Sequence, residues 1–424
     1  MEKDQIPQNY KPLNIDTIKQ FVLSKAKLRN IFKNIDNLKV TEVGDGNLNL
    51  VFFINSESQS ICIKQPLPYL RVLKNWPLTL KRSYFESEYI KIHSNHVAKF
   101  MPQLLDYDDQ FCTIAMEKLT PHIIMRQGMI KGIKYVHFSE HISEFISKTL
   151  FFTSDLYLKA ADKKNYITKF SNNTELCKIT EDLIFTEPYI VDKKNRWTRP
   201  YLDNLKNEIE NNFELKVATS KLKLKFLTNN EALLHGDLHT GSIMCTETDT
   251  KVIDPEFSFY GPMGFDLGAL IANLIINYFS QNGHEDIKGD RSDYKEWIIT
   301  TIVDCWKKFE VKFIDLWQNN QCGDAYTKNF FVNDKEKFLI EQRAYLSNLL
   351  IESIGFAGTK MIRRIFGFAH NIDLDWIKDD KKRAECEYKS ARLAITMISN
   401  SDSFKKIEDL VLKVKNFDIQ EVKF

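Results

Sequence analysis

The chain has 424 residues, of which 43% are hydrophobic and 27% are charged, and 59 basic side chains nearly balance 57 acidic ones. This length is more than one hydrophobic core usually holds, so it predicts two lobes or domains. The formal net charge of +2 gives no bulk reason to expect nucleic acid or an anionic membrane as a partner. Any bound anion must therefore be held by local geometry.

The seven cysteines are scattered and form no CxxC pair, which is typical of reduced thiols in a cytoplasmic protein. The first residues, 1–4, are charged and lack the apolar centre of a signal peptide. The most apolar run, 267–279, is too short to span a bilayer and is interrupted by Asn273 and Asn277. We therefore expect a buried helix there.

The first third of the sequence is rich in strand patterns. Two short β-type runs, 51–54 and 61–64, are separated by a polar turn, and a glycine-bearing turn at 42–47 precedes them. This order predicts an antiparallel sheet. A helix is expected around 80–93, where apolar residues recur at helical spacing. Two further apolar runs follow, at 103–107 and 111–116.

From about Leu119 onward, segments with helical periodicity dominate. They cover roughly residues 140–160, 202–228, 265–280, 291–318, 335–370 and 380–415. One β island interrupts them, with a strand at 232–234 and a hairpin at 242–253. The pattern predicts an α+β fold with two lobes: an antiparallel β-rich N-lobe over 1–118 and a mostly helical C-lobe over 119–424.

The turn Gly44-Asp45-Gly46-Asn47 lies between two predicted strands. Glycine lets the backbone approach a phosphate closely and point its N–H groups at it. Taken alone, such a turn is far more often an ordinary hairpin turn.

Lys64 ends the third predicted strand, where it is placed to reach the phosphates of a nucleotide. A lysine in this position needs a carboxylate to hold it. Glu86 and Glu88 on the next helix are the candidates, and we prefer Glu86. Taken singly, a strand lysine or a helix glutamate is usually a solvated side chain.

Asp237 lies in the loop His235-Gly236-Asp237-Leu238-His239, directly after an apolar strand. There its side chain can project into a cleft, orient an acceptor hydroxyl for in-line attack and accept the proton late in transfer. A loop aspartate is otherwise a common turn former. His235 is expected to have a structural role in the loop.

Asp254-Pro255-Glu256 ends the predicted hairpin. In an extended segment, residues i and i+2 point to the same side, so both carboxylates are expected to face one spot. That arrangement suits Mg²⁺ bridging to phosphate oxygens. A solvent-exposed turn is an equally good interpretation of the tripeptide alone.

The order of these pieces is more informative than any one of them. A glycine-bearing turn, a strand lysine, a helix glutamate, a strand followed by HxD and a hairpin aspartate occur in this order in protein kinases. The combination predicts phosphoryl transfer from ATP.

At these residues the chain resembles the methylthioribose kinases, small-molecule kinases with a protein-kinase-like fold. The resemblance rests on the blocks 44–49, 235–242 and 254–266 and extends to 76–78 and 360–364. It implies that the γ-phosphoryl group of ATP moves to the 1-hydroxyl of 5-methylthioribose, a step of methionine salvage, with Mg²⁺ as cofactor. It also implies a homodimer.

The resemblance further implies roles for single residues. Asn47 and Lys64 would contact the ATP phosphates, Asp254 and Glu256 would bind magnesium, and Asp237 would act on the sugar hydroxyl. The hinge that meets adenine would be formed by the backbone of Glu117, Lys118 and Leu119. The arginine pair at the sugar site would be Arg363 and Arg364. Without the family match, that pair is equally well a basic patch on a helix.

Three features depart from the protein-kinase pattern. Asn49 stands in place of the third glycine, Ser242 in place of the second metal-binding asparagine, and the magnesium motif is DPE. These leave the ligands of a second metal open. Residues 261–266 lead promptly into an apolar helix, which argues against an activation loop and a protein substrate. We expect Asp266 to cap that helix and to hold the catalytic loop.

Other functions remain as alternatives. A kinase of the same fold could act on choline, which calls for an aromatic cage, on an aminoglycoside, which calls for an acidic pocket, or on homoserine. The arginine pair fits neither cation well. A nucleotide-binding pseudokinase module need not keep the strand lysine and all three acidic residues. Residues 137–141 match the zinc pattern HxxEH, but no third ligand follows at an obvious spacing.

Overall fold

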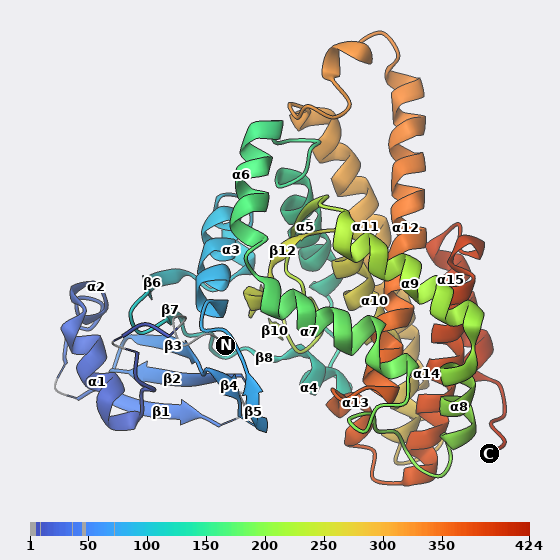
Figure 1. Cartoon of the computed structure of the whole chain (residues 1–424), viewed down its shortest axis with the longest axis horizontal. Coiled ribbons are helices and arrows are strands. Elements are labelled where there is room, and N and C mark those ends of the chain that lie inside the picture. The colour runs from blue at the N-terminus through green and yellow to red at the C-terminus, as the bar shows by residue number, and fades with distance from the viewer. Residues whose placement is uncertain (1–5, 9, 36, 45–47, 72) are drawn as a thin grey trace.

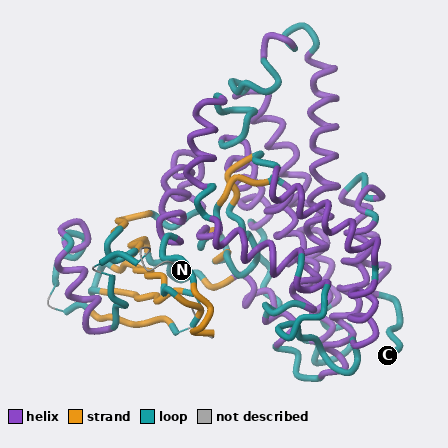
Figure 2. Tube along the Cα trace, in the orientation of Figure 1, coloured by secondary structure: helices purple, strands orange, loops and turns teal. Residues whose placement is uncertain are grey.

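The computed structural model describes the chain except residues 1–5, 9, 36, 45–47 and 72, together with the side chains of 73–75. Figure 1 shows a smaller lobe that carries the main sheet beside a larger helical lobe. In Figure 2 the strands gather in the smaller lobe, apart from a few short ones within the helical lobe. The predicted α+β class is therefore confirmed, with an antiparallel N-lobe and a helical C-lobe.

The N-lobe is built on a five-stranded antiparallel sheet with the strand order β1-β2-β3-β7-β6. Its strands are β1 Lys39–Val43, β2 Asn49–Asn55, β3 Ser60–Pro66, β6 Leu104–Asp108 and β7 Thr113–Glu117. Alternate residues of β2 are buried, with Phe52 and Ile54 fully covered, so one face of the sheet carries a core. The sheet predicted from the first third of the sequence is confirmed.

Helix α1 Ile15–Ser24 packs on this core and was not predicted. Its start is fixed by a capping box: Asn14 Oδ1 accepts from the Thr17 backbone N–H at 2.9 Å, and Thr17 Oγ1 accepts from the Asn14 N–H at 2.9 Å. The short helix α2 Ala26–Arg29 follows, and β4 Tyr69–Leu70 pairs with β5 Leu73–Pro77 beside the sheet.

Helix α3 Arg82–Val97 lies between β5 and β6 in the sequence and contacts the sheet strands β3, β6 and β7. Its apolar residues Phe85, Tyr89 and Val97 are buried in the large core that the C-lobe helices form. The helix therefore bridges the sheet and the C-lobe core.

The C-lobe is organised around α10 Gly264–Ser280, whose residues are all buried. This confirms the buried helix expected from the apolar run. Gly268 lets α12 approach closely, because a Cβ there would lie 2.6 Å from the Ser353 carbonyl oxygen. None of the helices in the described part of the chain is both long and apolar enough to cross a membrane.

Further helices build the rest of the C-lobe. They are α4 Met125–Ile130, α5 Phe138–Phe152, α6 Ala160–Phe170, α7 Thr174–Phe185, α8 Asp203–Asn211, α9 Phe213–Thr228, α11 Ser292–Asn320, α12 Lys335–Phe366, α13 Ile372–Asp375, α14 Asp380–Ser399 and α15 Ile407–Asp418. The single helices predicted over 202–228 and 380–415 are each split in two. In the first, Asn212 has extended backbone and its Oδ1 accepts from the Leu215 N–H at 2.9 Å, which starts α9 afresh.

Short strands of the C-lobe position the site loops. β10 Ile243–Cys245 pairs with β11 Thr250–Val252, which confirms the predicted hairpin, and also with β8 Ile123–Ile124. β9 Ala232–Leu234 pairs with β12 Phe259–Gly261, a pairing that was not predicted. The loops that follow β9 and β11 lie at the boundary with the N-lobe and line two cavities there.

Candidate active site

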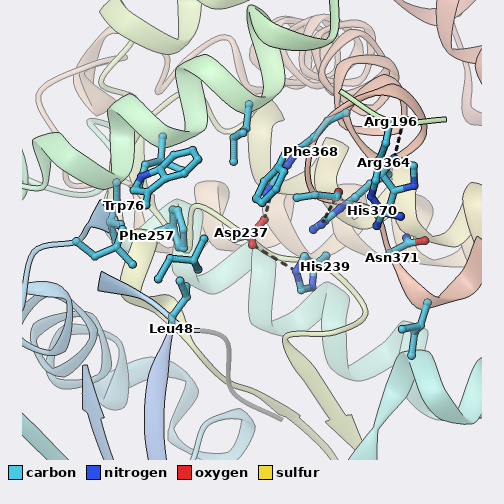
Figure 3. Close-up of a pocket in the computed structure, with 18 of the residues that line it drawn as sticks. Leu48, Trp76, Arg196, Asp237, His239, Phe257, Arg364, Phe368, His370 and Asn371 are labelled. Atoms are coloured by element: carbon cyan, nitrogen blue, oxygen red, sulfur yellow. Dashed lines mark hydrogen bonds and ion pairs between the residues drawn. The ribbon is translucent and has the colours of Figure 1, made fainter. Parts of the chain in front are cut away.

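Two neighbouring cavities lie between the lobes and share part of their walls. The large cavity has a volume of about 590 Å³ and the small cavity one of about 330 Å³. The residues that line both are Leu48, Asp237, His239 and Phe257. Figure 3 shows the large cavity, with Asp237 near the centre of the view. A molecule in one cavity and a molecule in the other would therefore meet at Asp237.

The small cavity contains a buried lysine held by two carboxylates. Lys64 Nζ donates to Glu86 Oε2 at 2.8 Å and to Asp254 Oδ1. Burial lowers the pKa of Lys64, but the two carboxylates outweigh it and raise that pKa above its usual value. Glu88 pairs with lysines outside the cavity instead. The structure thus places Glu86, the preferred candidate, against Lys64.

The segment with Asp254 and Glu256 is not extended, so the geometric reason given for their pairing was wrong. Asp254 has left-handed backbone, with φ 64° and ψ 45°, and a 3₁₀ turn follows over Pro255–Phe257. Glu256 Oε2 accepts from Asn49 Nδ2 at 3.1 Å and lies 3.5 Å from Arg82 Nε. Both carboxylates still line the small cavity, because the turn brings them to the same wall.

The loop that carries Asp237 is fixed from two sides. Asp266 at the start of α10 accepts from the backbone N–H groups of His235, at 2.7 Å, and Gly236, at 3.0 Å. His235 Nε2 lies 2.8 Å from the Ile253 carbonyl oxygen. Gly236 has φ +83°, and a Cβ there would lie 2.2 Å from the Phe257 carbonyl oxygen. The expected structural role of His235 and the expected hold of Asp266 on the loop agree with this geometry, but Asp266 does not cap α10, whose start has no side-chain cap bond.

The Asp237 carboxylate is surrounded by nitrogen-bearing side chains. His239 Nε2 lies 3.3 Å from Oδ2, and Lys360 Nζ and Arg363 Nη1 lie 3.5 and 3.8 Å from Oδ1. Burial alone would raise the pKa of Asp237, but these contacts hold that pKa well below its usual range. Ser242, the residue in place of a metal-binding asparagine, donates its hydroxyl to the Asp237 carbonyl at 3.0 Å.

Lys360 was not singled out in the sequence. Its side chain is buried, and Nζ lies 4.0 Å from the centre of the Phe265 ring. It does not line either cavity. Its spacing in the sequence is the signal that could have found it. Residues i, i+3 and i+4 of a helix share one face, and Lys360, Arg363 and Arg364 have this spacing on α12.

One end of the large cavity is apolar. Trp76 and Phe368 stack there, with ring centres 6.1 Å apart and an interplanar angle of 25°. The other apolar side chains of this end are Leu48, Leu70, Leu78, Leu176, Ile179, Leu183 and Phe257. Three of these belong to α7, a helix that the sequence analysis did not predict, so this wall was missed.

The other end of the large cavity is polar. Its side chains are Arg196, Asp237, His239, Arg363, Arg364, His370, Asn371 and Asp375. Arg364 Nη1 donates to the Ala369 carbonyl at 3.2 Å, and Arg196 Nη2 donates to Asp375 Oδ2 at 3.2 Å. The predicted arginine pair and Asp237 are therefore brought to one cavity by helix α12 and the loop after β9.

Comparisons with known proteins agree with this geometry. The model of the phosphotransferase enzyme family matches residues 167–294. Methylthioribose kinase 1 of Oryza sativa subsp. japonica is 41% identical over 416 residues, which are 97% of this chain and 96% of that protein. Methylthioribose kinase of Escherichia coli O45:K1 is 41% identical over 415 residues, 97% of this chain and 99% of its own.

The chain belongs to the methylthioribose kinase family. A solved structure of glucosamine kinase with glucosamine, ADP and inorganic phosphate is also similar to it. That similarity covers 89% of this chain and 85% of the other, with a TM-score of 0.48 and 11% identity.

Some residues to which the family resemblance gave a role do not line the two cavities. Glu117 ends β7 and accepts from the Gln103 N–H, and Lys118 Nζ donates to Asn55 Oδ1 at 2.7 Å. Leu119 follows them and lines neither cavity. Gly44 directly follows β1, and a Cβ there would meet no described atom within 4 Å, whereas Asp45, Gly46 and Asn47 lie outside the described residues.

Asp254 and Glu256 do not make a complete cation site by themselves. Among the described residues, no group of three or more His, Cys, Asp or Glu side chains could hold a metal ion. A cation in the small cavity would therefore take its remaining ligands from a bound molecule or water.

His141, from the HxxEH pattern, has Nδ1 at 3.2 Å from Thr250 Oγ1 on β11.

Proposed function

We propose that this chain catalyses phosphorylation of the 1-hydroxyl of 5-methylthioribose by ATP, a step of methionine salvage. The observation that carries the proposal is that Asp237 belongs to two cavities at once. One cavity carries a buried lysine and two carboxylates. The other combines an apolar end with an arginine-rich end, which suits a sugar with a thioether substituent.

The small cavity is assigned to the triphosphate of ATP. Lys64 lies at its wall with a positive charge that Glu86 keeps in place, as a phosphate-binding lysine requires. The glycine-bearing turn 44–47 and the hinge 117–119 complete the nucleotide site by family resemblance. If nucleotide binding breaks the contact between Lys64 and Asp254, the Lys64 ammonium group becomes available to the phosphates and the Asp254 carboxylate to Mg²⁺.

Asp254 and Glu256 are the residues that would hold Mg²⁺. The Asp254 side chain is 47% exposed, and Glu256 contacts Asn49 and Arg82 through Oε2. Carboxylate oxygens are the ligands that Mg²⁺ prefers in proteins. When bound, the ion neutralises charge on the phosphates.

The large cavity is assigned to the acceptor sugar. Hydroxyls of a sugar can hydrogen-bond at the polar end, while a methylthio group can bury its surface beside Trp76 and Phe368. Choline and aminoglycosides are cations, and the three arginines at the polar end disfavour them electrostatically although aromatic rings are present. The neutral sugar is therefore the better match.

Asp237 positions the reacting hydroxyl in this proposal. Because its pKa is well below the usual range, the carboxylate stays ionised and is a weak base. Its main contribution is to accept a hydrogen bond from the hydroxyl and align it for in-line attack, taking the proton late, as the new bond to phosphorus forms. Arg363 and Arg364 hold the sugar beside it.

An ADP-release assay against four acceptors tests the proposal. We expect turnover with 5-methylthioribose and none with choline, homoserine or kanamycin, and phosphorus NMR of the product should show a 1-phosphate. Turnover of a cationic acceptor together with inactivity on 5-methylthioribose would contradict the assignment.

A homodimer in the cytoplasm completes the proposal, supported by the family resemblance. The chain mass is 49.7 kDa. Light scattering on the purified protein should therefore give a mass about twice that of one chain, and a mass of one chain would contradict the dimer.

A further inference from the structure

Asn371 is a buried residue of the large cavity whose side chain has no partner. The residue is 4% exposed, and neither Oδ1 nor Nδ2 makes a hydrogen bond to any described residue. Figure 3 places it at the polar end of the cavity, near His370 and Arg364. A buried polar group without a partner costs about 1–3 kcal/mol, and such groups in native structures call for an explanation.

Helix capping does not explain this side chain. Asn371 directly precedes the short helix α13, where an asparagine normally bonds to backbone N–H groups of the first turn. No such side-chain bond is present. Instead, its backbone carbonyl accepts from the N–H groups of Leu374, at 3.3 Å, and Asp375, at 3.0 Å. The backbone is thus fixed while the amide remains at the cavity wall.

The chain just before Asn371 is fixed as well. Arg364, at the end of α12, donates to the Ala369 carbonyl at 3.2 Å, and His370 Nε2 lies 2.8 Å from the Arg196 carbonyl oxygen. These bonds hold the loop between α12 and α13 against the cavity. The backbone that carries the Asn371 amide is therefore held in place by the protein before any ligand binds, as a recognition group requires.

The amide differs chemically from the charged side chains at this end, and the ring nitrogens of His239 and His370 already contact protein atoms. An arginine can only donate hydrogen bonds and an ionised aspartate can only accept them, whereas an asparagine amide does both from adjacent atoms. Two neighbouring hydroxyls of a sugar offer the complementary pair, a donor from one and an acceptor on the other. Choline and homoserine each offer a single hydroxyl.

We infer that Asn371 binds two neighbouring hydroxyls of the acceptor sugar and is a specificity-determining residue for a neutral sugar diol. Oδ1 accepts from one hydroxyl and Nδ2 donates to the other. The inference rests on the proposed function, because it places the acceptor in the large cavity. Asn371 sets the orientation of the sugar ring, and Asp237 contacts the reacting hydroxyl.

Wild type and Asn371→Ala are compared on 5-methylthioribose and on its 2-deoxy and 3-deoxy analogues. Wild type should lose about 10- to 100-fold in kcat/KM on an analogue that lacks a hydroxyl bound by Asn371. The kcat/KM of Asn371→Ala on 5-methylthioribose should be lower than that of wild type by a similar factor. It should not fall further on that analogue. The KM for ATP should not change, because Asn371 does not line the small cavity.

Asn212→Ala is the matched control, because Asn212 is a cap-position asparagine outside both cavities. It should leave the kinetics and the discrimination unchanged. Asn371→Ala should melt at or above the wild-type temperature, since its side chain makes no bond in the protein. If it does not fold, Asn371→Ser serves the same comparison.

Two failures can be told apart. A folded, active Asn371 variant that discriminates between the deoxy analogues as wild type does would overturn the inference and leave the proposed function intact. Wild type that does not phosphorylate 5-methylthioribose would overturn the proposed function, and with it the role of Asn371.

Discussion

Asp237 is held among three nitrogen-bearing side chains, and each contact favours its ionised form. Such a group is suited to holding a hydroxyl in line with a phosphorus atom rather than to removing its proton early. In the proposed function, transfer depends on both the charge that Asp237 carries and the position that it keeps.

Replacing Asp237 with alanine should reduce kcat by about 10³-fold or more, because the acceptor loses its orienting partner. Binding of ATP, followed by calorimetry, should stay within about twofold of wild type, since Lys64, Asp254 and Glu256 are untouched. Full activity of this variant would rule out the assigned role.

Lys360 gives the site a pH dependence. Burial lowers its pKa to about 8, against the pull of Asp237. Below that pH its charge helps to hold Asp237 in place, and above it the charge is lost. We expect kcat/KM of wild type to fall as pH rises through about 8, and Lys360→Met to be about 10- to 100-fold less active at pH 7.

The shape of the pH profile separates this positioning role from a purely structural one. Lys360→Met should lack the fall near pH 8, and Lys360→Arg, which stays charged, should move it to higher pH. An alkaline limb that is unchanged in both variants would show that another group titrates there.

At the scale of elements, strong patterns predicted structure well and isolated residues did not. The short β-type run 51–54 predicted β2, and the apolar run 267–279 predicted α10. Helix α7 was missed although Leu176, Thr180 and Leu183 repeat at helical spacing, because charged residues separate them. The left-handed Asp254 was missed because local sequence gave no sign of it.

Helix α14 carries a buried carboxylate away from the reacting groups. Glu387 is 1% exposed and lines a cavity of about 480 Å³ with Thr198 and Arg383. Burial raises its pKa to about 7. A group with a raised pKa in the folded state contributes its full stability below the unfolded value and loses it as pH rises through about 7.

Glu387→Gln should therefore stabilise the protein relative to wild type at pH 8, by up to roughly 3 kcal/mol, and much less at pH 5. Urea unfolding at the two pH values measures the difference. Glu385→Gln, on the same helix but less buried, is the control for the loss of a negative charge from α14. A gain that does not grow with pH would contradict the account.

At the scale of the whole molecule, one buried arginine joins the lobes. Arg82, fully buried at the start of α3, donates to the Leu48 carbonyl at 2.7 Å and to Asn49 Oδ1 at 3.1 Å. It also lies 3.5 Å from Glu256 Oε2. The sequence indicated two lobes but not this connection, because a single arginine in a helical segment carries no distinguishing pattern.

Arg82→Met should lower the free energy of unfolding by about 3–5 kcal/mol, because it leaves Glu256 buried without its cation. Lys91→Met on the same helix removes an exposed ion pair with Glu88 and should cost less than about 1 kcal/mol. Chemical unfolding monitored by circular dichroism compares the two. If both variants lose less than about 1 kcal/mol of unfolding free energy, Arg82 is not needed to compensate the buried charge of Glu256.

The packing of α3 has a mechanical consequence. Its apolar residues are embedded in the large core, whereas Lys64 stands on strand β3 of the sheet. The bond between Glu86 and Lys64 therefore ties the sheet to the helical body. If the sheet were displaced relative to the helices, this bond would lengthen, so the direction in which the nucleotide lysine points depends on how the two lobes pack.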